Sequence, residues 1–317
     1  MPRVTFKPPL FNSASPWATT EIDLQDLYNS PFTGAVTTRT SLLAGFPHNP
    51  SIHQHTLFDS PTNSLNTYGY SPYPLKFYLD TVKSVIAGTG KPQTKPFIIS
   101  ITGTPEEVAE AVTAVNDVAK AGYHLLVEAN LSCPNIPDKP PPAYSLPELK
   151  AYLDLLSKLK VGVPIGLKTP PYTYDAQFQV LLSALKAYPS LVSFITSTNT
   201  LGSSLHLSSQ PSLAASEGKR AIYQPTLSSP TGTGIGGLGG ASIHWLSLGN
   251  VSTIRRMLDQ VQELKDVAVI GVGGVSDRDG WERMLSVGAE GVGVATALGE
   301  NGVSVFAKIL SEESSGG

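Results

Sequence analysis

The sequence has almost no cysteine and no long apolar run. Its 317 residues include one cysteine, which excludes an intramolecular disulfide and a zinc site built from several cysteines. No stretch approaches the roughly 18 apolar residues of a membrane helix. The opening segment MPRVTFKPPLFNS lacks the apolar core of a signal peptide. We therefore expect a cytoplasmic protein with no membrane partner.

Positive charge and several common motifs are also missing. The chain has 22 Lys and Arg against 25 Asp and Glu, a net charge of −3, and no basic run, which argues against a nucleic-acid partner. The GxxxxGK[ST], HExxH and GxSxG motifs do not occur, so the usual NTPase, zinc-protease and hydrolase signatures are absent. His53 and His55 lie two apart in a polar segment without a carboxylate or cysteine nearby, and we expect no metal site.

What the sequence does contain is an alternation of apolar runs and amphipathic segments. Apolar residues make up 41% of the chain, enough for a large core. Eight short runs bounded by Gly, Pro, Ser or Asn read as buried strands. They are Leu10–Ala14, Gly34–Thr38, Pro96–Ile101, His124–Asn130, Pro164–Lys168, Leu191–Thr196, Val267–Val272 and Gly291–Ala295.

Helical patterns separate most of these runs. The segment after the third run has Thr104 as a candidate N-cap, Pro105 at the first helical position and Gly122 after the last turn. Further helices are predicted at Leu146–Lys160, Tyr174–Tyr188, Val251–Lys265, Ser276–Val287 and Gly302–Leu310. About eight βα units indicate a (β/α)8 TIM barrel, with residues 1–317 as one domain. A doubly wound sheet is the alternative, disfavoured by the strand count and by the lack of an early GxGxxG.

Two segments are too long for the turns of a bare barrel. Residues 46–74 are rich in Pro, Asn, Ser, His and Tyr, and residues 203–240 are rich in Ser, Thr, Pro and Gly. Long insertions of this kind are usually lids or binding loops. We expect both to emerge at the C-terminal face of the barrel, where the active sites of this fold lie.

The only cysteine follows a predicted strand. Cys133 stands in EANLSCPN, between Asn130 and Asn135. A thiol acts as a base only when it is ionised, and amide side chains offer both a donor and an acceptor to a ligand with imide edges. The alternative is that Cys133 is a small buried apolar side chain.

Glycine clusters mark the last predicted strands. The run VAVIGVGGV leads to Ser276 and Asp277, and Gly293-Val294-Ala295-Thr296 ends the next strand. Such loops at helix N-termini predict a phosphate site, although the glycines alone also fit tight turns. The run GIGGLGG at 234–240 is less specific, and Lys168 in GLKTPPY ends a strand where it would face the barrel mouth.

Together these motifs resemble class 1A dihydroorotate dehydrogenase. NLSCPN, GLKTPPY, GIGGLGG and IGVGGV match that family in order and spacing over nearly the whole chain. The resemblance implies an FMN-dependent barrel enzyme, a cytosolic homodimer that oxidises dihydroorotate to orotate and passes electrons to fumarate.

The resemblance also assigns residues. Cys133 matches the catalytic base, which removes the C5 proton while C6 delivers hydride to flavin N5, and Lys168 matches a lysine near flavin N1. The substrate-binding matches are Asn66, Asn130, Asn135, Asn199 and Ser197, with Arg39 and Thr196 at family substrate positions. The cofactor-binding matches are Ser13, Ala14, Gly236, Gly237, Gly273, Gly274, Ala295 and Thr296.

The chain departs from the family pattern on the substrate side. Arg39 replaces a lysine, Tyr68 and Tyr70 replace smaller apolar residues, Thr196 replaces an asparagine and Asp138 replaces a glycine. The departures leave open another dihydropyrimidine or a cyclic enone as the substrate. They also leave open a catalytically silent barrel that binds a phosphorylated ligand. A flavin-free sugar-phosphate isomerase would explain the phosphate loops but not the Asn and Cys cluster.

Overall fold

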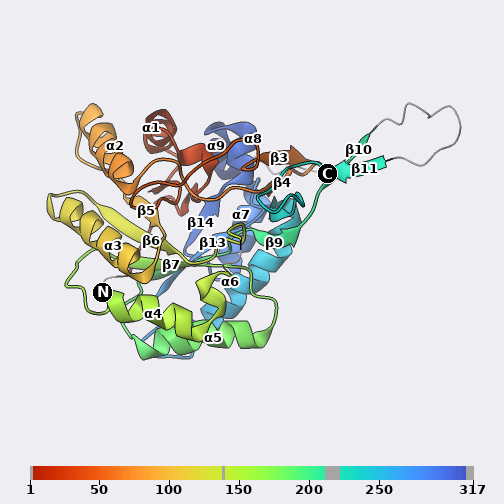
Figure 1. The fold of residues 1–317 in the computed structure, drawn as a ribbon. Coiled ribbons are helices and arrows are strands. Elements are labelled where there is room, and N and C mark those ends of the chain that lie inside the picture. The colour runs from red at the N-terminus through yellow and green to blue at the C-terminus, as the bar shows by residue number, and fades with distance from the viewer. Residues whose placement is uncertain (1–2, 138–139, 211–221, 312–317) are drawn as a thin grey trace, which may run out of the picture.

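The computed structural model describes residues 3–137, 140–210 and 222–311; Asp138 lies outside this range. Eight parallel strands form a nearly closed barrel with helices around it (Figure 1), in the order β1-β14-β13-β8-β7-β6-β5-β2. The predicted (β/α)8 barrel is therefore confirmed. The strands are β1 (Leu10–Asn12), β2 (Val36–Thr37), β5 (Phe97–Ile101), β6 (Leu125–Asn130), β7 (Ile165–Thr169), β8 (Phe194–Ser197), β13 (Ala268–Val272) and β14 (Gly291–Val294).

The barrel closes between β1 and β2 without a regular ladder. The Gly34 N–H donates to Leu10 O at 2.8 Å. The Asn12 side chain then takes over the bonding, since its Oδ1 accepts from Thr37 N at 2.9 Å and its Nδ2 donates to Thr37 O. A buried amide side chain thus satisfies the backbone groups that the two short strands leave unpaired.

The helices lie outside the barrel. They are α1 (Glu21–Asn29), α2 (Leu75–Gly88), α3 (Pro105–Lys120), α4 (Leu146–Leu156), α5 (Asp175–Ala187), α6 (His244–Asp259), α7 (Arg278–Ser286), α8 (Thr296–Asn301) and α9 (Ser304–Leu310). Short 3-10 turns occur at Pro16–Ala18, Pro142–Tyr144 and Ala241–Ile243. Thr104 caps α3 as predicted, and its hydroxyl accepts from Glu107 N. Across the described ranges we find no helix with the length and apolar character needed to span a bilayer.

One predicted helix lies at shifted bounds in the structure. The helix expected at Val251–Lys265 begins seven residues earlier, at His244, and ends at Asp259. Its first half contains Gly249 and Asn250, which favour loops in isolation. Here the Asn250 side chain bonds both the N–H and the C=O of Tyr172, and this tertiary contact keeps the segment helical.

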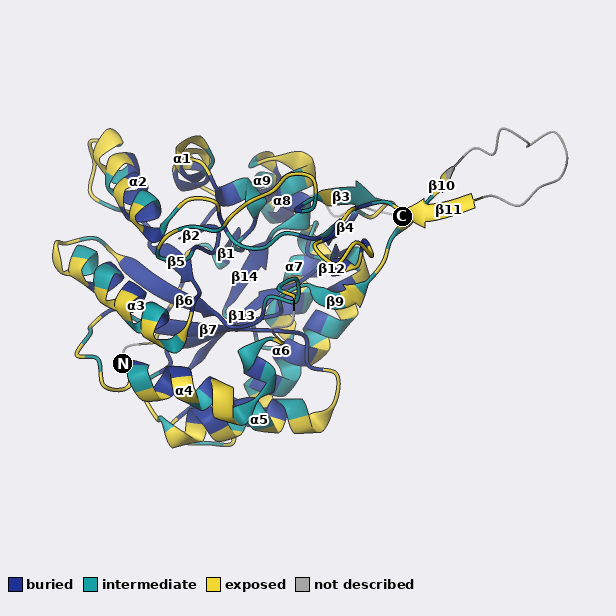
Figure 2. Cartoon of the chain, in the orientation of Figure 1, coloured by how far each residue is buried: buried dark blue, intermediate teal, exposed yellow. Residues whose placement is uncertain are grey.

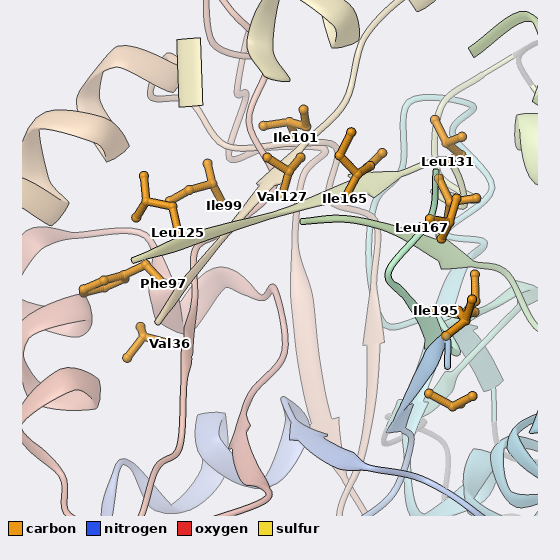
Figure 3. Packing of buried hydrophobic residues seen from close by; sticks show 14 of the residues in the cluster. Val36, Phe97, Ile99, Ile101, Leu125, Val127, Leu131, Ile165, Leu167 and Ile195 are labelled. Carbon is orange, nitrogen blue, oxygen red and sulfur yellow. The ribbon is translucent and has the colours of Figure 1, made fainter. Parts of the chain in front are cut away.

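Buried side chains form two layers that follow the alternation of each strand. One face of the strands points outward against the helices, and Figure 3 shows this layer with Ile99, Val127 and Leu167 among its members. The other face fills the barrel interior with residues such as Ile98, Leu126, Phe194 and Ile270. Figure 2 shows the buried strands at the centre and exposed faces on the outer helices. The packed interior fixes the strand ends that carry the site.

The two insertions contain strands of their own. In residues 46–74 these are β3 (His55–Phe58) and β4 (Asn63–Asn66), and in residues 203–240 the main one is β12 (Gly236–Gly240). With β9 (Leu201–Ser204) they form an antiparallel sheet in the order β3-β4-β12-β9. Strands β10 (Leu207–Gln210) and β11 (Ile222–Pro225) pair separately and project from the body (Figure 1).

The glycine run of β12 is the reason that sheet can form. Gly237 is the cross-strand partner of Asn66, and a Cβ on Gly236 would lie 2.2 Å from the Asn66 carbonyl oxygen. Only glycine allows the strand to approach β4 so closely. Glycine is unfavourable in strands, and the run therefore reads as a loop in the sequence.

Candidate active site

The predicted cysteine site lies at the carboxyl end of β6. Asn130 ends the strand, and the next five residues turn across the barrel mouth with Cys133 at the wall of a cavity of about 770 Å³. Asn66, Asn130 and Asn135 line the same cavity. The structure therefore brings together residues that are up to 69 positions apart in the chain.

The half-buried thiol of Cys133 has opposing influences on its ionisation. The pKa of the Cys133 thiol is raised above its ordinary value, because the effect of burial exceeds the lowering by the Asn135 backbone N–H, the Tyr70 hydroxyl and the positive charge of Lys168. Burial also raises the pKa of Tyr70, so its phenol stays protonated and can donate. Burial therefore outweighs the three neighbours, which reduce the rise of the thiol pKa but do not reverse it.

The amide side chains are held by specific hydrogen bonds. Asn135 Nδ2 donates to Asn66 Oδ1 and to Tyr68 O, both at 2.9 Å. Asn66 Nδ2 donates to Gly237 O at 3.1 Å, and Asn199 Nδ2 donates to Ser132 Oγ at 2.9 Å. These contacts tie the cysteine loop to β4 and β12, so the amides are oriented before any ligand binds.

Arg39 contributes a buried positive charge to this cavity. The residue is 8% exposed, its guanidinium lies 5.0 Å from the centre of the Tyr68 ring, and its Nη1 donates to Thr19 Oγ1 at 3.3 Å. Its Nη2 has no partner among the described residues, and burial lowers the pKa of Arg39. A buried guanidinium with an unpaired donor is a site for an anion.

Aromatic side chains form one wall of the cavity. Tyr68 and Tyr70 line it together with Trp17 and His55, and His55 Nδ1 bonds the Tyr68 hydroxyl at 2.9 Å. The rings narrow the space without filling it. Trp17 and His55 were missed by sequence reasoning, because nothing near them in the chain links them to the cysteine loop.

A second cavity of about 590 Å³ adjoins the first. Among the predicted cofactor residues, its wall includes Ser13, Ala14, Lys168, Gly273, Gly274, Ala295 and Thr296. Lys168, Ala14 and Thr296 line both cavities. The two spaces therefore form one continuous site, with the cysteine and amides on one side and the glycine loops on the other.

The donor set of this second cavity fits a phosphorylated cofactor. Ala295, Thr296 and Ala297 line it at the start of α8, where first-turn N–H groups lack helical partners. Lys168 is buried at 3% exposure, and its Nζ donates to Ser13 Oγ at 3.1 Å. An ammonium held by one hydroxyl in a buried wall favours an anionic ligand.

Four predicted contacts lie outside the walls of these two cavities. Gly236 lines a third cavity with Pro134 and Asn135, and Gly237 pairs with Asn66. Later glycines of the same run, Gly239 and Gly240, face the second cavity instead. The hydroxyls of Thr196 and Ser197 are buried at the end of β8 without a partner among the described residues.

Residues just after β8 take the place expected of Thr196 and Ser197. Thr198, Asn199 and Thr200 line the second cavity. They continue the segment TSTNT, which includes the predicted Asn199. No group of three or more His, Cys, Asp or Glu side chains that could hold a metal occurs in the described ranges.

Comparison with known proteins agrees with this geometry. The family model described as dihydroorotate dehydrogenase matches residues 1–315. A fumarate-type dihydroorotate dehydrogenase of Trypanosoma brucei brucei is 32% identical, covering 97% of this chain and 89% of its own. A putative dihydroorotate dehydrogenase A (fumarate) of Streptococcus pyogenes serotype M5 is 31% identical, covering 96% and 87%.

A solved structure supports the fold separately. The ligand-free dihydroorotate dehydrogenase of Eimeria tenella superposes with a TM-score of 0.68 at 17% identity, covering 97% of this chain and 85% of that one. At that identity the likeness concerns the barrel alone. The match over nearly the whole length and the relatives above 30% identity are decisive: the chain belongs to the dihydroorotate dehydrogenase family, among its class 1A, fumarate-type members.

Proposed function

We propose that this protein oxidises dihydroorotate to orotate with FMN as its cofactor and fumarate as the electron acceptor. The observation that carries the proposal is the position of Cys133 among three amides at the junction with a cavity suited to a phosphorylated cofactor. Members of this family are flavin enzymes, and FMN is the flavin whose single phosphate suits one glycine-lined cradle.

The proposed substrate matches the side chains of the first cavity. Dihydroorotate carries one carboxylate and an imide-like ring edge. The unpaired Nη2 of Arg39 offers a charge-assisted bond to the carboxylate. Asn66, Asn130 and Asn135 offer amide donors and acceptors to the ring. Arg39 keeps the charge of the family lysine, and its planar fork suits a carboxylate.

Cys133 would take the proton from C5 of the substrate. That proton is acidified by the neighbouring carbonyl group, so a base of moderate strength suffices. The base is the thiolate, which the Tyr70 hydroxyl, the Asn135 N–H and the Lys168 charge favour against the effect of burial on the pKa. When bound, FMN supplies the acceptor for the hydride that leaves C6.

Lys168 would hold the negative charge that builds up on the cofactor side. Its Nζ lies in a buried wall shared by both cavities and has Ser13 Oγ as a neutral partner. We assign Gly273, Gly274, Ala295 and Thr296 to the phosphate end. Gly239 and Gly240 replace Gly236 and Gly237 in this proposal, because they face the cavity.

We also propose a cytoplasmic homodimer. The family resemblance is the source of this proposal. The projecting β10–β11 pair supports it, because it exposes Leu207, Ile222 and Tyr223, and exposed apolar clusters of this kind mark protein contacts. Sedimentation velocity of the purified chain tests it, and a monomer at micromolar concentration would contradict it.

An anaerobic titration tests the proposed activity. The purified protein should be yellow, dihydroorotate should bleach it, and fumarate should restore the colour. Cys133→Ala should keep the flavin and lose the bleaching, because only the base is removed. Wild-type protein that binds FMN but is not bleached would refute the assignment, as would bleaching of Cys133→Ala at the wild-type rate.

A second candidate is a flavin enzyme acting on another dihydropyrimidine or a cyclic enone. The aromatic wall of Trp17, His55, Tyr68 and Tyr70 favours it, because it narrows the cavity. Orotate distinguishes the two, since a product of the reaction perturbs the absorption spectrum of the bound flavin. Absence of that perturbation in a protein that chemical reductants bleach would favour the second candidate.

A further inference from the structure

A row of hydrogen-bonded side chains runs from the barrel interior to the cysteine loop. It starts at Glu128, which is 2% exposed and whose Oε1 accepts from Ser100 Oγ at 2.9 Å. Ser100 Oγ and Thr40 Oγ1 lie 2.8 Å apart. Asn130 Nδ2 donates to Thr40 Oγ1 at 2.9 Å. Ser132 Oγ donates to Asn130 Oδ1 at 2.7 Å.

The strand geometry explains why this row exists. Leu126, Glu128 and Asn130 alternate along β6 and share the face that points into the barrel. Ser100 is opposite Glu128 in the pairing of β5 with β6, so the two side chains meet inside. Glu128 therefore lies one layer below the site, where it reaches no cavity wall of the two that form the site.

Glu128 gives the row a direction. The Ser100 hydroxyl donates its only hydrogen to Glu128 Oε1. Ser100 then accepts from Thr40, because a hydroxyl has one hydrogen. Thr40 in turn accepts from Asn130, which requires the amide nitrogen, not the oxygen, to face Thr40. Without the carboxylate, the Ser100 and Thr40 pair could point either way.

This direction fixes what Asn130 presents to a ligand. One hydrogen of its Nδ2 goes to Thr40. Its Oδ1 accepts from Ser132 Oγ at 2.7 Å, from Ser132 N at 3.3 Å and from Asn199 Nδ2 at 3.4 Å, so donors on the other side of the amide hold the same orientation as the row. The second hydrogen of Nδ2 remains, and Asn130 lines the first cavity. Asn130 in this orientation is an amide donor to a carbonyl group of the ligand. A flipped amide would present a carbonyl oxygen in its place and repel that ligand group.

We propose that Glu128 is a positioning residue for the substrate: through Ser100 and Thr40 it orients the Asn130 amide so that an N–H group faces the ligand. The proposal rests on the proposed function in that the ligand is orotate or dihydroorotate. No bond is made or broken at Glu128, and its effect is on binding.

Orotate binding to the flavin-loaded protein tests the proposal. Ser100→Ala breaks the row without changing a cavity wall, and we expect the orotate Kd to rise about fivefold, the ratio that one lost hydrogen bond gives. Glu128→Gln can donate to Ser100 as well as accept from it, so the row is no longer held in one direction and the Kd should rise about twofold to threefold. KM should rise with the Kd, while kcat and flavin content stay close to wild type.

A matched control and a double-variant cycle separate positioning from general damage. Ser41 is as buried as Ser100, and its Oγ has no partner among the described residues, so Ser41→Ala should leave the Kd unchanged. In an Asn130→Ala background, Ser100→Ala should have no further effect on the Kd. An equal rise in both backgrounds, or no rise in wild type, would overturn the proposal.

A second measurement does not depend on the ligand. The unfolding equilibrium constants of wild type, Ser100→Ala, Asn130→Ala and the double variant form a double-mutant cycle. If the two residues are connected, the factor by which Ser100→Ala changes the constant should differ by about threefold or more between the wild-type and the Asn130→Ala background. An equal factor in the two backgrounds would show that Ser100 and Asn130 are not coupled, and would overturn the proposed row of hydrogen bonds. If wild type fails to bind orotate, the proposed function fails, and this cycle still decides whether Ser100 and Asn130 are coupled.

Discussion

Tyr70→Phe should make the Cys133 thiol harder to ionise. The phenol of Tyr70 favours the thiolate, and burial keeps that phenol protonated by raising its own pKa. A hydrogen bond to a charged group contributes about 1.5–3 kcal/mol. Loss of the phenol should therefore raise the pKa of Cys133, and the lower end of this range corresponds to about a tenfold smaller population of thiolate. Phenylalanine keeps the ring, so the cavity wall is retained.

Alkylation by iodoacetamide measures this shift directly. Cys133 is the only cysteine in the chain, so the modification rate reports one thiol. Between pH 6 and 8 the rate for Tyr70→Phe should be about tenfold below wild type, because the reactive thiolate is about tenfold less populated. The limb of the pH profile of turnover that reports the base should move to higher pH.

Tyr68→Phe is the matched control for Tyr70→Phe. The Tyr68 hydroxyl bonds His55 Nδ1 at 2.9 Å, and it is not among the groups that act on the pKa of Cys133. Its alkylation profile should coincide with that of wild type. Coincident profiles for Tyr70→Phe and wild type would refute the reasoning, because they would show that the phenol has no influence on the thiol.

Three further predictions concern the cofactor side and the base of the barrel. Gly274→Ala should be purified with less flavin than wild type, because Gly274 has φ +69° and a Cβ there would lie 2.7 Å from a backbone oxygen. The control Gly302→Ala, at φ +65° with open space around it, should keep its flavin, and equal flavin content in the two variants would contradict the assignment of Gly274 to the cofactor site. Lys168→Met should lower the midpoint potential of the bound flavin in a spectroelectrochemical titration, since the charge beside Ser13 is lost; an unchanged potential would remove Lys168 from that role. Burial lowers the pKa of Lys95 to about 8, below its unfolded value of about 10.4, so the native state binds fewer protons and stability rises from about pH 8 to pH 10. Urea unfolding at pH 7 to 10 should show Lys95→Met with a flatter rise than wild type, and parallel curves would contradict this.

Local patterns predicted the barrel well because each strand and helix is specified by nearby residues. Thr104 and Pro105 set the start of α3, and the apolar runs coincide with the strands within a few residues. The helices α1 and α2 were not predicted. For α1 a local signal was available, since Thr20 and Asp23 form a capping box at its start. Contacts with α2 add to it, as where Glu21 accepts from Ser84.

The site residues also fall into those that local sequence patterns could predict and those that they could not. The motif around Cys133 and the position of Lys168 at a strand end could be inferred because strand ends meet at one face of the barrel. The role of Tyr70 could not, because 63 residues separate it from Cys133 and only the folded insertion brings the phenol to the sulfur. The glycine run at 234–240 was recognised, but which glycines face the cavity depends on the pairing of β12 with β4.

The ladder between β4 and β12 joins the two insertions into a single mechanical unit. Asn66 and Gly237 are partners in it, and Asn135 of the cysteine loop is bonded to Asn66. A ligand that enters between these segments cannot displace one of them alone without breaking main-chain bonds. Ligand entry and release must therefore either use the existing openings or move β4 and β12 together.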